Sequence, residues 1–355
     1  PDVRTTRTYL FDGACVTVDF DLDDAASASL LVELDSALSF QPRDELVDRL
    51  DRFARGDASA AQASGRVAQP RARRLAFVFP GQGGQWVGMA RELLAREPAF
   101  RATLERADAA LRLMVDWSLL AQLQADPGDA AFRLDDIAVL QPVLAAVEIA
   151  LAELWRAYGI EPAAVVGHSM GEAAAACVSG ALTLDDALSI VCQRSRLMRR
   201  TSGQGAMAMV ELSADEAEAR VSSHAGRLTV AVHNGPRSTV VSGEPDAVRE
   251  LAAALEADGV FCRLVKVDVA SHGPQMDPLV PELVASLEGL AAGPSGIPLY
   301  STVTGARAAG ESLDAAYWGR NLRERVRFHE TVAAMQADGI DGFIEMSPHP
   351  VLLPA

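Results

Sequence analysis

The stretch VVGHSMGEAAAA, residues 165–176, decides the fold of this chain. Val165 and Val166 end a short apolar run, Ser169 follows between two glycines, and an alanine-rich segment then predicts a helix. A serine at such a strand-to-helix turn is the pattern of a nucleophile elbow, in which the hydroxyl stands at the carboxyl end of a sheet. The amide of the next residue, Met170, then faces any oxyanion that forms beside the helix N-terminus.

Strand and helix patterns alternate on both sides of this turn. An apolar run from Leu75 to Phe79 meets a glycine-rich turn, and the later patterns predict helices at 88–96, 98–113, 143–158 and 329–339 and strands at 297–303 and 343–346. The alternation predicts an α/β fold with a parallel sheet flanked by helices. Ligands of such folds bind outside the carboxyl ends of the strands, where both glycine-rich turns would lie.

Residues 205–267 have a different order of elements. Their patterns predict strand, helix, strand, strand, helix and strand within about sixty residues, which is the βαββαβ order of a ferredoxin-like unit. We therefore expect a small subdomain at 201–270 inserted into a large one made of 71–200 and 271–355. The large strand and helix patterns resume only after the insertion.

Residues 1–70 carry no evident chemistry and are expected to form a linker or adaptor. They contain strand-like segments at 9–11 and 14–20, a helical pattern at 43–53, and a connector of small residues at 56–70.

The composition bounds the function. The chain has 355 residues, of which 49% are hydrophobic and 23% charged, and this is typical of a globular protein with two or three domains. Its four cysteines have no C-x-x-C spacing, so we expect reduced thiols, a cytoplasmic location and no metal site. No signal peptide and no uninterrupted membrane-spanning run is predicted, because Glu148 and Glu153 break the longest apolar stretch. The net charge of −16 argues against nucleic-acid binding.

A serine hydroxyl is a weak nucleophile and needs a positioned base. The chain has six histidines. His168 lies on the elbow beside Ser169, where its side chain should point away, and His224 and His233 lie within the small unit. His272 follows the small unit, where the chain returns to the large one, and it is the first candidate for the base. A surface histidine without a catalytic role is the alternative.

Five ordered motifs extend this hypothesis. The segments FPGQGGQW (79–86), GHSMGE (167–172), QRSRLM (193–198), VASH (269–272) and NLRERVRF (321–328) resemble those of the acyltransferase domains of type I polyketide synthases. These domains are in turn similar to malonyl-CoA:acyl carrier protein transacylases. The resemblance covers residues 75–353, and it implies an α/β-hydrolase-like large domain with the ferredoxin-like insertion.

The resemblance implies a Ser–His dyad. Ser169 would be the acylated nucleophile and His272 its general base, with the backbone carbonyl of Asn321 orienting the imidazole. The amides of Gln82 and Met170 would form the oxyanion hole. The substrates would be a malonyl-type acyl-CoA and the phosphopantetheine thiol of an acyl carrier protein, with no permanently bound cofactor. A ketosynthase would be the neighbour in the same polypeptide.

Arg194 would set the substrate class in this family. A guanidinium fork matches a carboxylate through two parallel charge-assisted hydrogen bonds, so Arg194 would hold the free carboxylate of a malonyl-type unit. The alternative is a solvated basic helix face, because three more arginines share this helix. Gln141 matches a family glutamine near the pocket and, with Asn321 and His168, would support the site.

The choice of extender unit depends on the residues around the dyad. Family members that take methylmalonyl tend to have a glutamine after the serine and YASH before the base, and malonyl-specific members tend to have HAFH. This chain has Met170 together with Val269, Ala270 and Ser271, and so matches neither set. One methyl group in an apolar pocket changes discrimination by only about 1–3 kcal/mol. We expect malonyl because the glutamine is missing, and methylmalonyl or a larger unit is the alternative.

Two other classes of protein are alternatives to an acyltransferase. A serine thioesterase or hydrolase would share the elbow and the sheet, but Arg194 and the inserted unit favour the transferase. A non-catalytic docking module would not need the serine, the histidine and two oxyanion amides together.

Overall fold

The computed structural model describes residues 4–11, 14–21, 28–34, 73–267 and 269–352, and the chain divides into two compact units, Pro1–Ala72 and Arg73–Ala355. In the first unit, β1 (Arg4–Phe11), β2 (Ala14–Asp21) and β3 (Ala28–Leu34) form an antiparallel sheet in that order. The sequence predicted the first two strands in part and missed the third. The helix expected at 43–53 and the connector at 56–70 lie outside the described residues.

The second unit contains a mixed sheet in the order β11-β10-β5-β4-β13. Four of its strands are parallel: β4 (Leu75–Phe79), β5 (Ala164–Gly167), β10 (Leu299–Ser301) and β13 (Gly342–Glu345). The edge strand β11 (Ala306–Ala308) is antiparallel to β10, which differs from the all-parallel expectation. The reason is the short link between Ser301 and Ala306, because a parallel connection needs a crossover of a dozen or more residues.

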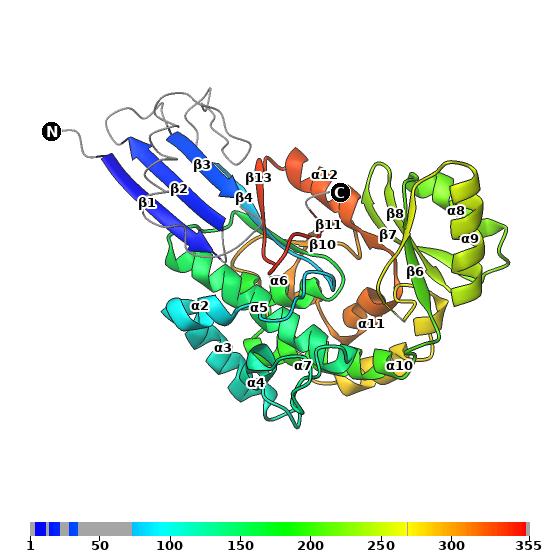
Figure 1. Ribbon diagram of the computed structural model, residues 1–355, viewed down its shortest axis with the longest axis horizontal. Coiled ribbons are helices and arrows are strands. Elements are labelled where there is room, and N and C mark those ends of the chain that lie inside the picture. Colours follow the sequence, from blue (N-terminus) through cyan, green and yellow to red (C-terminus); the bar gives the residue numbers. More distant parts are fainter. Residues whose placement is uncertain (1–3, 12–13, 22–27, 35–72, 268, 353–355) are drawn as a thin grey trace. The chain divides into compact units, whose positions relative to one another are not determined.

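Helices surround this sheet (Figure 1). They are α2 (Arg91–Arg96), α3 (Pro98–Leu111), α4 (Leu119–Gln124), α5 (Ile137–Ala157), α6 (Gly171–Ser179), α7 (Leu184–Arg199), α10 (Val280–Ser286), α11 (Ala315–Arg323) and α12 (Phe328–Ala337). Two short 3₁₀ turns lie at Pro274–Met276 and Gly310–Ser312.

The central helix is α5, which contacts α3, α6 and α7. It begins six residues before the predicted start, because the Asp136 side chain caps it by accepting from the N–H of Ala138 at 2.9 Å. By length and composition α5 could cross a membrane, but 94% of its most apolar window is buried inside the fold. Its apolar surface is therefore explained by packing as a core helix.

A second sheet has the order β12-β7-β8-β6-β9. Residues 206–264 supply β6 (Ala206–Val210), α8 (Ala214–Ser222), β7 (Leu228–Gly235), β8 (Ser238–Gly243), α9 (Pro245–Ala257) and β9 (Cys262–Leu264). This is the predicted βαββαβ order. The short strand β12 (Val326–Arg327), which the sequence analysis did not predict, adds to the sheet parallel to β7.

The two faces of the second sheet pack differently. Figure 1 shows α8 and α9 side by side on one face, and their apolar residues form a core cluster with that face, including Val210, Val241 and Leu251. Residues of the other face, such as Met207 and Val232, belong to a core cluster that also contains Val78 of the first sheet. The second sheet is thus joined to the first through shared core. The subdomain boundaries at 200 and 270 stay a prediction.

Candidate active site

The turn between β5 and α6 holds Ser169 in a left-handed backbone conformation, with φ of 56°. A non-glycine residue rarely adopts this conformation, and the neighbouring glycines make room for it. A Cβ on Gly167 would lie 2.2 Å from the Glu172 backbone, and a Cβ on Gly171 would lie 2.1 Å from the carbonyl oxygen of Phe79. Both glycines are therefore required by close backbone approach.

Ser169 and His272 are in direct contact. Ser169 Oγ lies 2.7 Å from His272 Nε2, although 103 residues separate them in sequence. His272 has a φ of 58°, so the backbone of the second residue of the pair is in the left-handed region as well. Such conformations cost free energy and tend to occur at functional sites, where the surrounding fold enforces them.

The other ring nitrogen of His272 is held by a backbone carbonyl. His272 Nδ1 lies 3.0 Å from the carbonyl oxygen of Glu324. Because a carbonyl can only accept, Nδ1 carries the proton and Nε2 is left to accept the proton of Ser169. The sequence analysis assigned this role to the carbonyl of Asn321, three residues earlier. The Glu324 carbonyl, directly after the end of α11 at Arg323, makes the 3.0 Å contact, and the backbone of Asn321 also acts on the imidazole by raising the pKa of His272.

Burial keeps the His272 imidazole neutral. Its side chain is buried, and burial, together with the charge of Arg194 and the ring of His168, lowers its pKa to about 3. The backbone carbonyls of Glu324 and Asn321 oppose this shift but do not outweigh it. The imidazole can therefore accept a proton throughout the neutral pH range.

Arg194 points from α7 towards the same serine. Its Nη2 donates to Ser169 Oγ at 3.4 Å, and its Nη1 donates to Asn321 Oδ1 at 3.0 Å. The side chain is fully buried, its Nε has no partner, and burial lowers its pKa only to about 10, so it stays charged. Among the described residues, no carboxylate forms an ion pair with it. A buried guanidinium with a free donor can bind an anion through charge-assisted hydrogen bonds.

Asn321 connects these groups through its side chain. Its Oδ1 accepts from Arg194, and its Nδ2 donates to the carbonyl oxygen of Ser169 at 3.1 Å. The amide thus fixes the guanidinium and the serine turn relative to each other. The sequence analysis named Asn321 as a supporting residue but gave the role to its backbone.

A buried carboxylate fastens the elbow from below. Glu172, in the first turn of α6, accepts at 2.5 Å from both the N–H and the hydroxyl of Thr302, and also from the hydroxyl of Tyr317. Burial raises its pKa, and these hydrogen bonds oppose the shift. The network ties α6 to the end of β10 and to α11. Sequence reasoning missed it, although the position of Glu172 directly after the elbow is a usable signal.

The two amides predicted to bind an oxyanion are unengaged. Met170 is the residue before α6, and neither its N–H nor that of Gln82 donates a backbone hydrogen bond among the described residues. A Cβ on Gly81 would lie 3.6 Å from Ser169 Cβ, so the loop that carries Gln82 lies against the elbow. Met170 follows Ser169 directly in the chain, and Gln82 follows the glycine that lies against Ser169.

His168 and Gln141 lie around this centre. His168 Nε2 lies 2.9 Å from Asn234 Oδ1 in β7, so this side chain joins the elbow to the second sheet. Burial lowers the pKa of His168 to about 4. Gln141 is buried on α5, and its Oε1 has no partner.

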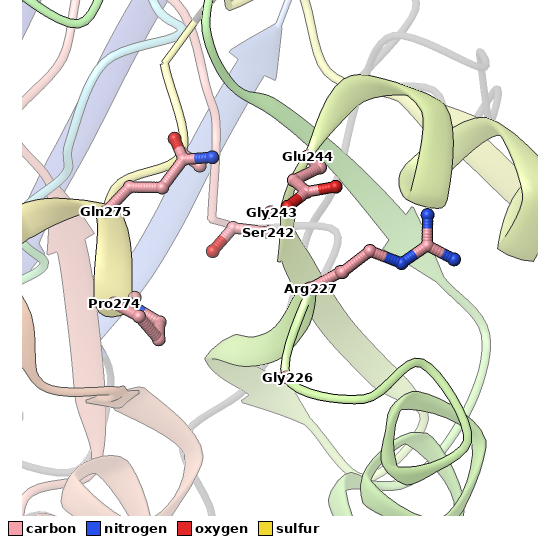
Figure 2. A pocket seen from close by; sticks show the side chains of 9 residues that line it. Gly226, Arg227, Ser242, Gly243, Glu244, Pro274 and Gln275 are labelled. Atoms are coloured by element: carbon pink, nitrogen blue, oxygen red, sulfur yellow. The ribbon is translucent and has the colours of Figure 1, made fainter.

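The three predicted specificity residues have different surroundings. Val269 is buried and lines a cavity of about 550 Å³ together with Gln82. Ala270 lines a second cavity of about 230 Å³, shown in Figure 2, where Pro274 and Gln275 face Ser242 and Glu244. The Ser271 carbonyl accepts from Ser242 Oγ at 2.9 Å. Of the three, Val269 is the one that borders the larger cavity beside Gln82.

The contact between Ser242 and Ser271 also positions the base. It fastens the loop of His272 to β8, and a Cβ on Gly273 would lie 2.8 Å from the side chain of Thr229 in β7. The catalytic histidine candidate is therefore held by the second sheet, whereas the serine is held by the first. Within the described residues, no group of three or more His, Cys, Asp or Glu side chains is arranged to hold a metal ion.

Comparison with known proteins identifies a family model and several relatives that are similar to this chain. Residues 76–355 match the family model described as the acyl transferase domain. The chain is 46% identical over 320 residues to erythronolide synthase EryA2 of Saccharopolyspora erythraea, covering 90% of this chain and 9% of that protein. It is 49% identical over 311 residues to polyketide synthase GfsB of Streptomyces halstedii, covering 87% of this chain and 6% of the relative. The chain thus spans less than a tenth of these curated relatives.

Two solved structures are similar over most of the chain. The acyltransferase domain from module 8 of the salinomycin polyketide synthase has a TM-score of 0.84 and 42% identity, covering 92% of this chain and 75% of that one. The malonyl CoA-acyl carrier protein transacylase of Coxiella burnetii has a TM-score of 0.71 and 30% identity, covering 78% of this chain and 87% of that one.

Proposed function

Because this chain belongs to the acyl transferase domain family and its relatives are type I polyketide synthases, we propose that it loads a malonyl-type extender unit from acyl-CoA onto an acyl carrier protein. The observation that carries the proposal is the buried guanidinium of Arg194, which has no carboxylate partner among the described residues and points at the hydroxyl of Ser169. A malonyl-type thioester brings the anion that this cation lacks.

The first half-reaction forms an acyl-serine. Ser169 Oγ attacks the thioester carbonyl while its proton passes to His272 Nε2. The oxyanion is stabilised by the amides of Gln82 and Met170. The carbon–sulfur bond then breaks, and the departing CoA sulfur takes the proton back from His272. The free carboxylate stays on Arg194 throughout.

The second half-reaction repeats these steps with another thiol. The phosphopantetheine thiol of the carrier protein gives its proton to His272 Nε2 and attacks the acyl-serine carbonyl. The ester bond to Ser169 Oγ breaks, and His272 returns the proton to the serine. No permanently bound cofactor takes part. The carrier and a ketosynthase are proposed as neighbours because the relatives are much longer multidomain synthases.

The substrate class is narrowed by the residues near the acyl group. We propose a preference for malonyl over methylmalonyl, supported by Met170 in place of the glutamine typical of methylmalonyl-specific members. The residual discrimination is expected to be small, since one methyl group is worth about 1–3 kcal/mol.

Intact-protein mass spectrometry tests the proposal. The wild type, mixed separately with malonyl-, methylmalonyl- and acetyl-CoA, should gain a covalent acyl mass, fastest with malonyl, and should lose it on addition of a carrier protein. Ser169→Ala should show no mass gain. Acylation of another residue would refute the nucleophile assignment, and rapid loss of the acyl group to water without carrier would instead indicate a thioesterase or hydrolase.

A further inference from the structure

The cavity of about 550 Å³ is lined both by neighbours of the dyad in the chain and by charged residues. Gln82 follows Gly81, whose added Cβ would lie 3.6 Å from Ser169 Cβ, and Val269 comes three residues before His272. Arg199, Lys266, Asp135 and Asp136 also line the cavity. Arg199 ends α7, whereas Lys266 follows β9 on the second sheet. The cavity is therefore bordered by a helix beside the first sheet and by a segment that follows a strand of the second sheet. Arg199 and Lys266 lie at its rim, and neither has a role in the proposed chemistry at Ser169.

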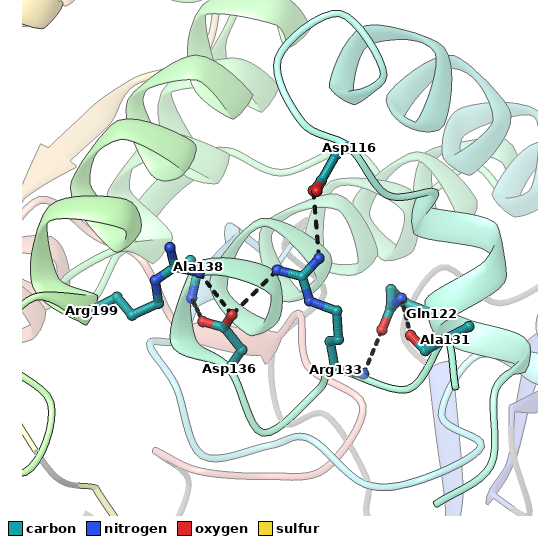
Figure 3. A network of polar contacts seen from close by, with 7 residues as sticks. All are labelled: Asp116, Gln122, Ala131, Arg133, Asp136, Ala138 and Arg199. Atoms are coloured by element: carbon teal, nitrogen blue, oxygen red, sulfur yellow. Dashed lines mark hydrogen bonds and ion pairs between the residues drawn. The ribbon is translucent and has the colours of Figure 1, made fainter. Parts of the chain in front are cut away.

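Arg199 is oriented by a fixed carboxylate. Its Nη1 lies 3.0 Å from Asp136 Oδ2, and Arg133 Nη2 lies 3.4 Å from the same oxygen (Figure 3). The other oxygen of Asp136 caps α5 through Ala138. Arg133 also reaches Asp116 at 3.4 Å. Asp136 is thus held from three sides, and it holds Arg199 at the rim of the cavity.

The remaining donors of Arg199 are available for a ligand. A guanidinium has five N–H donors, and one of them meets Asp136. Lys266 is exposed, and within the described part of the chain its ammonium has no hydrogen-bond or ion-pair partner. Arg199 and Lys266 thus offer donors from two walls of one cavity. An anion with several acceptor oxygens fits such a pair.

We propose that Arg199 and Lys266 form a subsite for the phosphate at the end of the pantetheine arm of the substrate. This inference rests on the proposed function, in which the arm must run from the thioester at Ser169 out through the cavity. Both malonyl-CoA and the carrier protein bring a phosphate at that end of the arm. The subsite acts locally, because the net charge of −16 repels an anionic ligand at long range.

Asp135 should oppose this binding. It is exposed, it lines the same cavity, and it has no ion-pair partner among the described residues. Asp136 differs because two arginines offset its charge. Removing the charge of Asp135 should therefore improve phosphate binding, whereas removing Arg199 or Lys266 should weaken it.

Acylation kinetics with two substrates, one with and one without the phosphate, measure the contribution of the phosphate to binding. Malonyl-phosphopantetheine and malonyl-pantetheine differ only in that group, and the readout is the ratio of their kcat/KM values for acylation of Ser169. Arg199→Gln and Lys266→Gln should each lower this ratio about two- to fivefold, as expected for partly exposed charge pairs, and Asp135→Asn should raise it. Arg200→Gln is the matched control, since Arg200 is next in sequence but pairs with Glu282 outside the cavity.

Two further measurements, loading from malonyl-CoA and transfer to the holo carrier protein, identify which phosphate is bound. Malonyl-CoA loading and transfer to the holo carrier should both weaken in Lys266→Gln if the shared phosphate is bound. A loss with malonyl-CoA but not with malonyl-phosphopantetheine would overturn the assignment, because it would point to another phosphate of CoA. Equal ratios in the wild type and all variants would also overturn it.

Chemical labelling gives a readout that does not need turnover. Lys266 is the only lysine of the chain, so an amine-reactive reagent reports on it in one peptide. Phosphopantetheine should protect Lys266 from labelling and pantetheine should not. If Ser169 were never acylated, the proposed function would fail while protection still tested the subsite. Equal labelling with both ligands would contradict the subsite itself.

Discussion

At the scale of single residues, Arg194 and His272 are buried close together in opposite charge states: Arg194 is a cation and His272 is neutral. Arg194 stays a cation although burial lowers its pKa to about 10, and its charge helps to lower the pKa of His272 to about 3. The cation that we propose to bind the substrate carboxylate therefore also helps to keep the proposed base, His272, neutral. A bound carboxylate would offset the charge of Arg194 and make His272 a stronger base when the substrate is in place.

Arg194→Ala tests this arrangement. Loss of one partner of a buried charge pair costs about 2–5 kcal/mol, so malonyl loading should fall at least about 30-fold. Acetyl-CoA has no carboxylate and should be tolerated as well as before or better. The measurement is the rate of acylation of Ser169 by each thioester. Arg196→Ala, an exposed position on the same helix, is the control. Equal losses with both thioesters would show that Arg194 has only a structural role.

At the scale of elements, the elbow depends on close packing of α6 against β4. Gly171 begins α6, and its Cα faces the carbonyl oxygens of Phe79 and Pro80. Glu172, the next residue, ties the same helix to Thr302 and Tyr317. The position of Ser169 is thus set by backbone contacts on one side and by buried hydrogen bonds on the other.

Gly171→Ala should destabilise the fold and misplace the serine. The added Cβ would lie 2.1 Å from the Phe79 carbonyl oxygen, so the backbone has to shift. Overpacking of this kind costs about 1–3 kcal/mol. The measurement is the free energy of unfolding in urea. Gly293→Ala is the matched control, because nothing lies within 4 Å of its added Cβ. Equal stability of the two variants would contradict the packing argument.

At the scale of the whole molecule, the site is assembled from distant parts of the chain. Ser169 follows a strand of the first sheet, the loop of His272 is tied to the second sheet through Ser242, and α11 supplies Asn321 and the carbonyl of Glu324. His168 adds a direct link to Asn234 of the second sheet. The proposed proton transfer between Ser169 and His272 therefore requires both sheets to be in place.

This assembly buries two neutral histidines, so stability should depend on pH. In the folded state the pKa is about 4 for His168 and about 3 for His272, against an ordinary value of 6.5. Between these pKa values the unfolded chain binds more protons than the folded chain. The contribution of the two histidines to the free energy of unfolding is therefore fully present above about pH 6.5 and is lost as the pH falls towards about 3. Glu148 and Glu172 act in the opposite direction, because burial raises the pKa of both.

The contribution of His272 to this pH dependence is therefore measured as the difference in unfolding free energy between the wild type and a His272 variant. Between pH 7.5 and pH 5, the wild type should lose more unfolding free energy than His272→Gln. His224→Gln, which removes a partly exposed histidine outside the site, serves as the control and should behave like the wild type. Parallel pH profiles for the wild type and His272→Gln would argue against a buried neutral imidazole.

The local elements could be predicted because their signals are local. The strand at Leu75–Phe79, the elbow at Ser169 and the four strands and two helices of residues 206–264 follow from apolar periodicity and glycine positions within short windows. Ser169 is a candidate because of its local turn pattern, and His272 because it follows the small unit. The role of Arg194 instead follows from the family resemblance, which depends on five ordered motifs spread over residues 79–328.

The tertiary structure decided what depends on contacts between distant segments. It added the Glu324 carbonyl to that of Asn321 beside the imidazole, since the end of α11 sets which carbonyls face this ring. It paired β12 with β7 and tied Glu172 to Tyr317, 145 residues away. It also set the pKa of His272, because desolvation is produced by the atoms packed around a group. The sequence by itself determined most of the helices and strands and the types of reactive residue. Packing between distant segments determined the partners of these residues and their charge states.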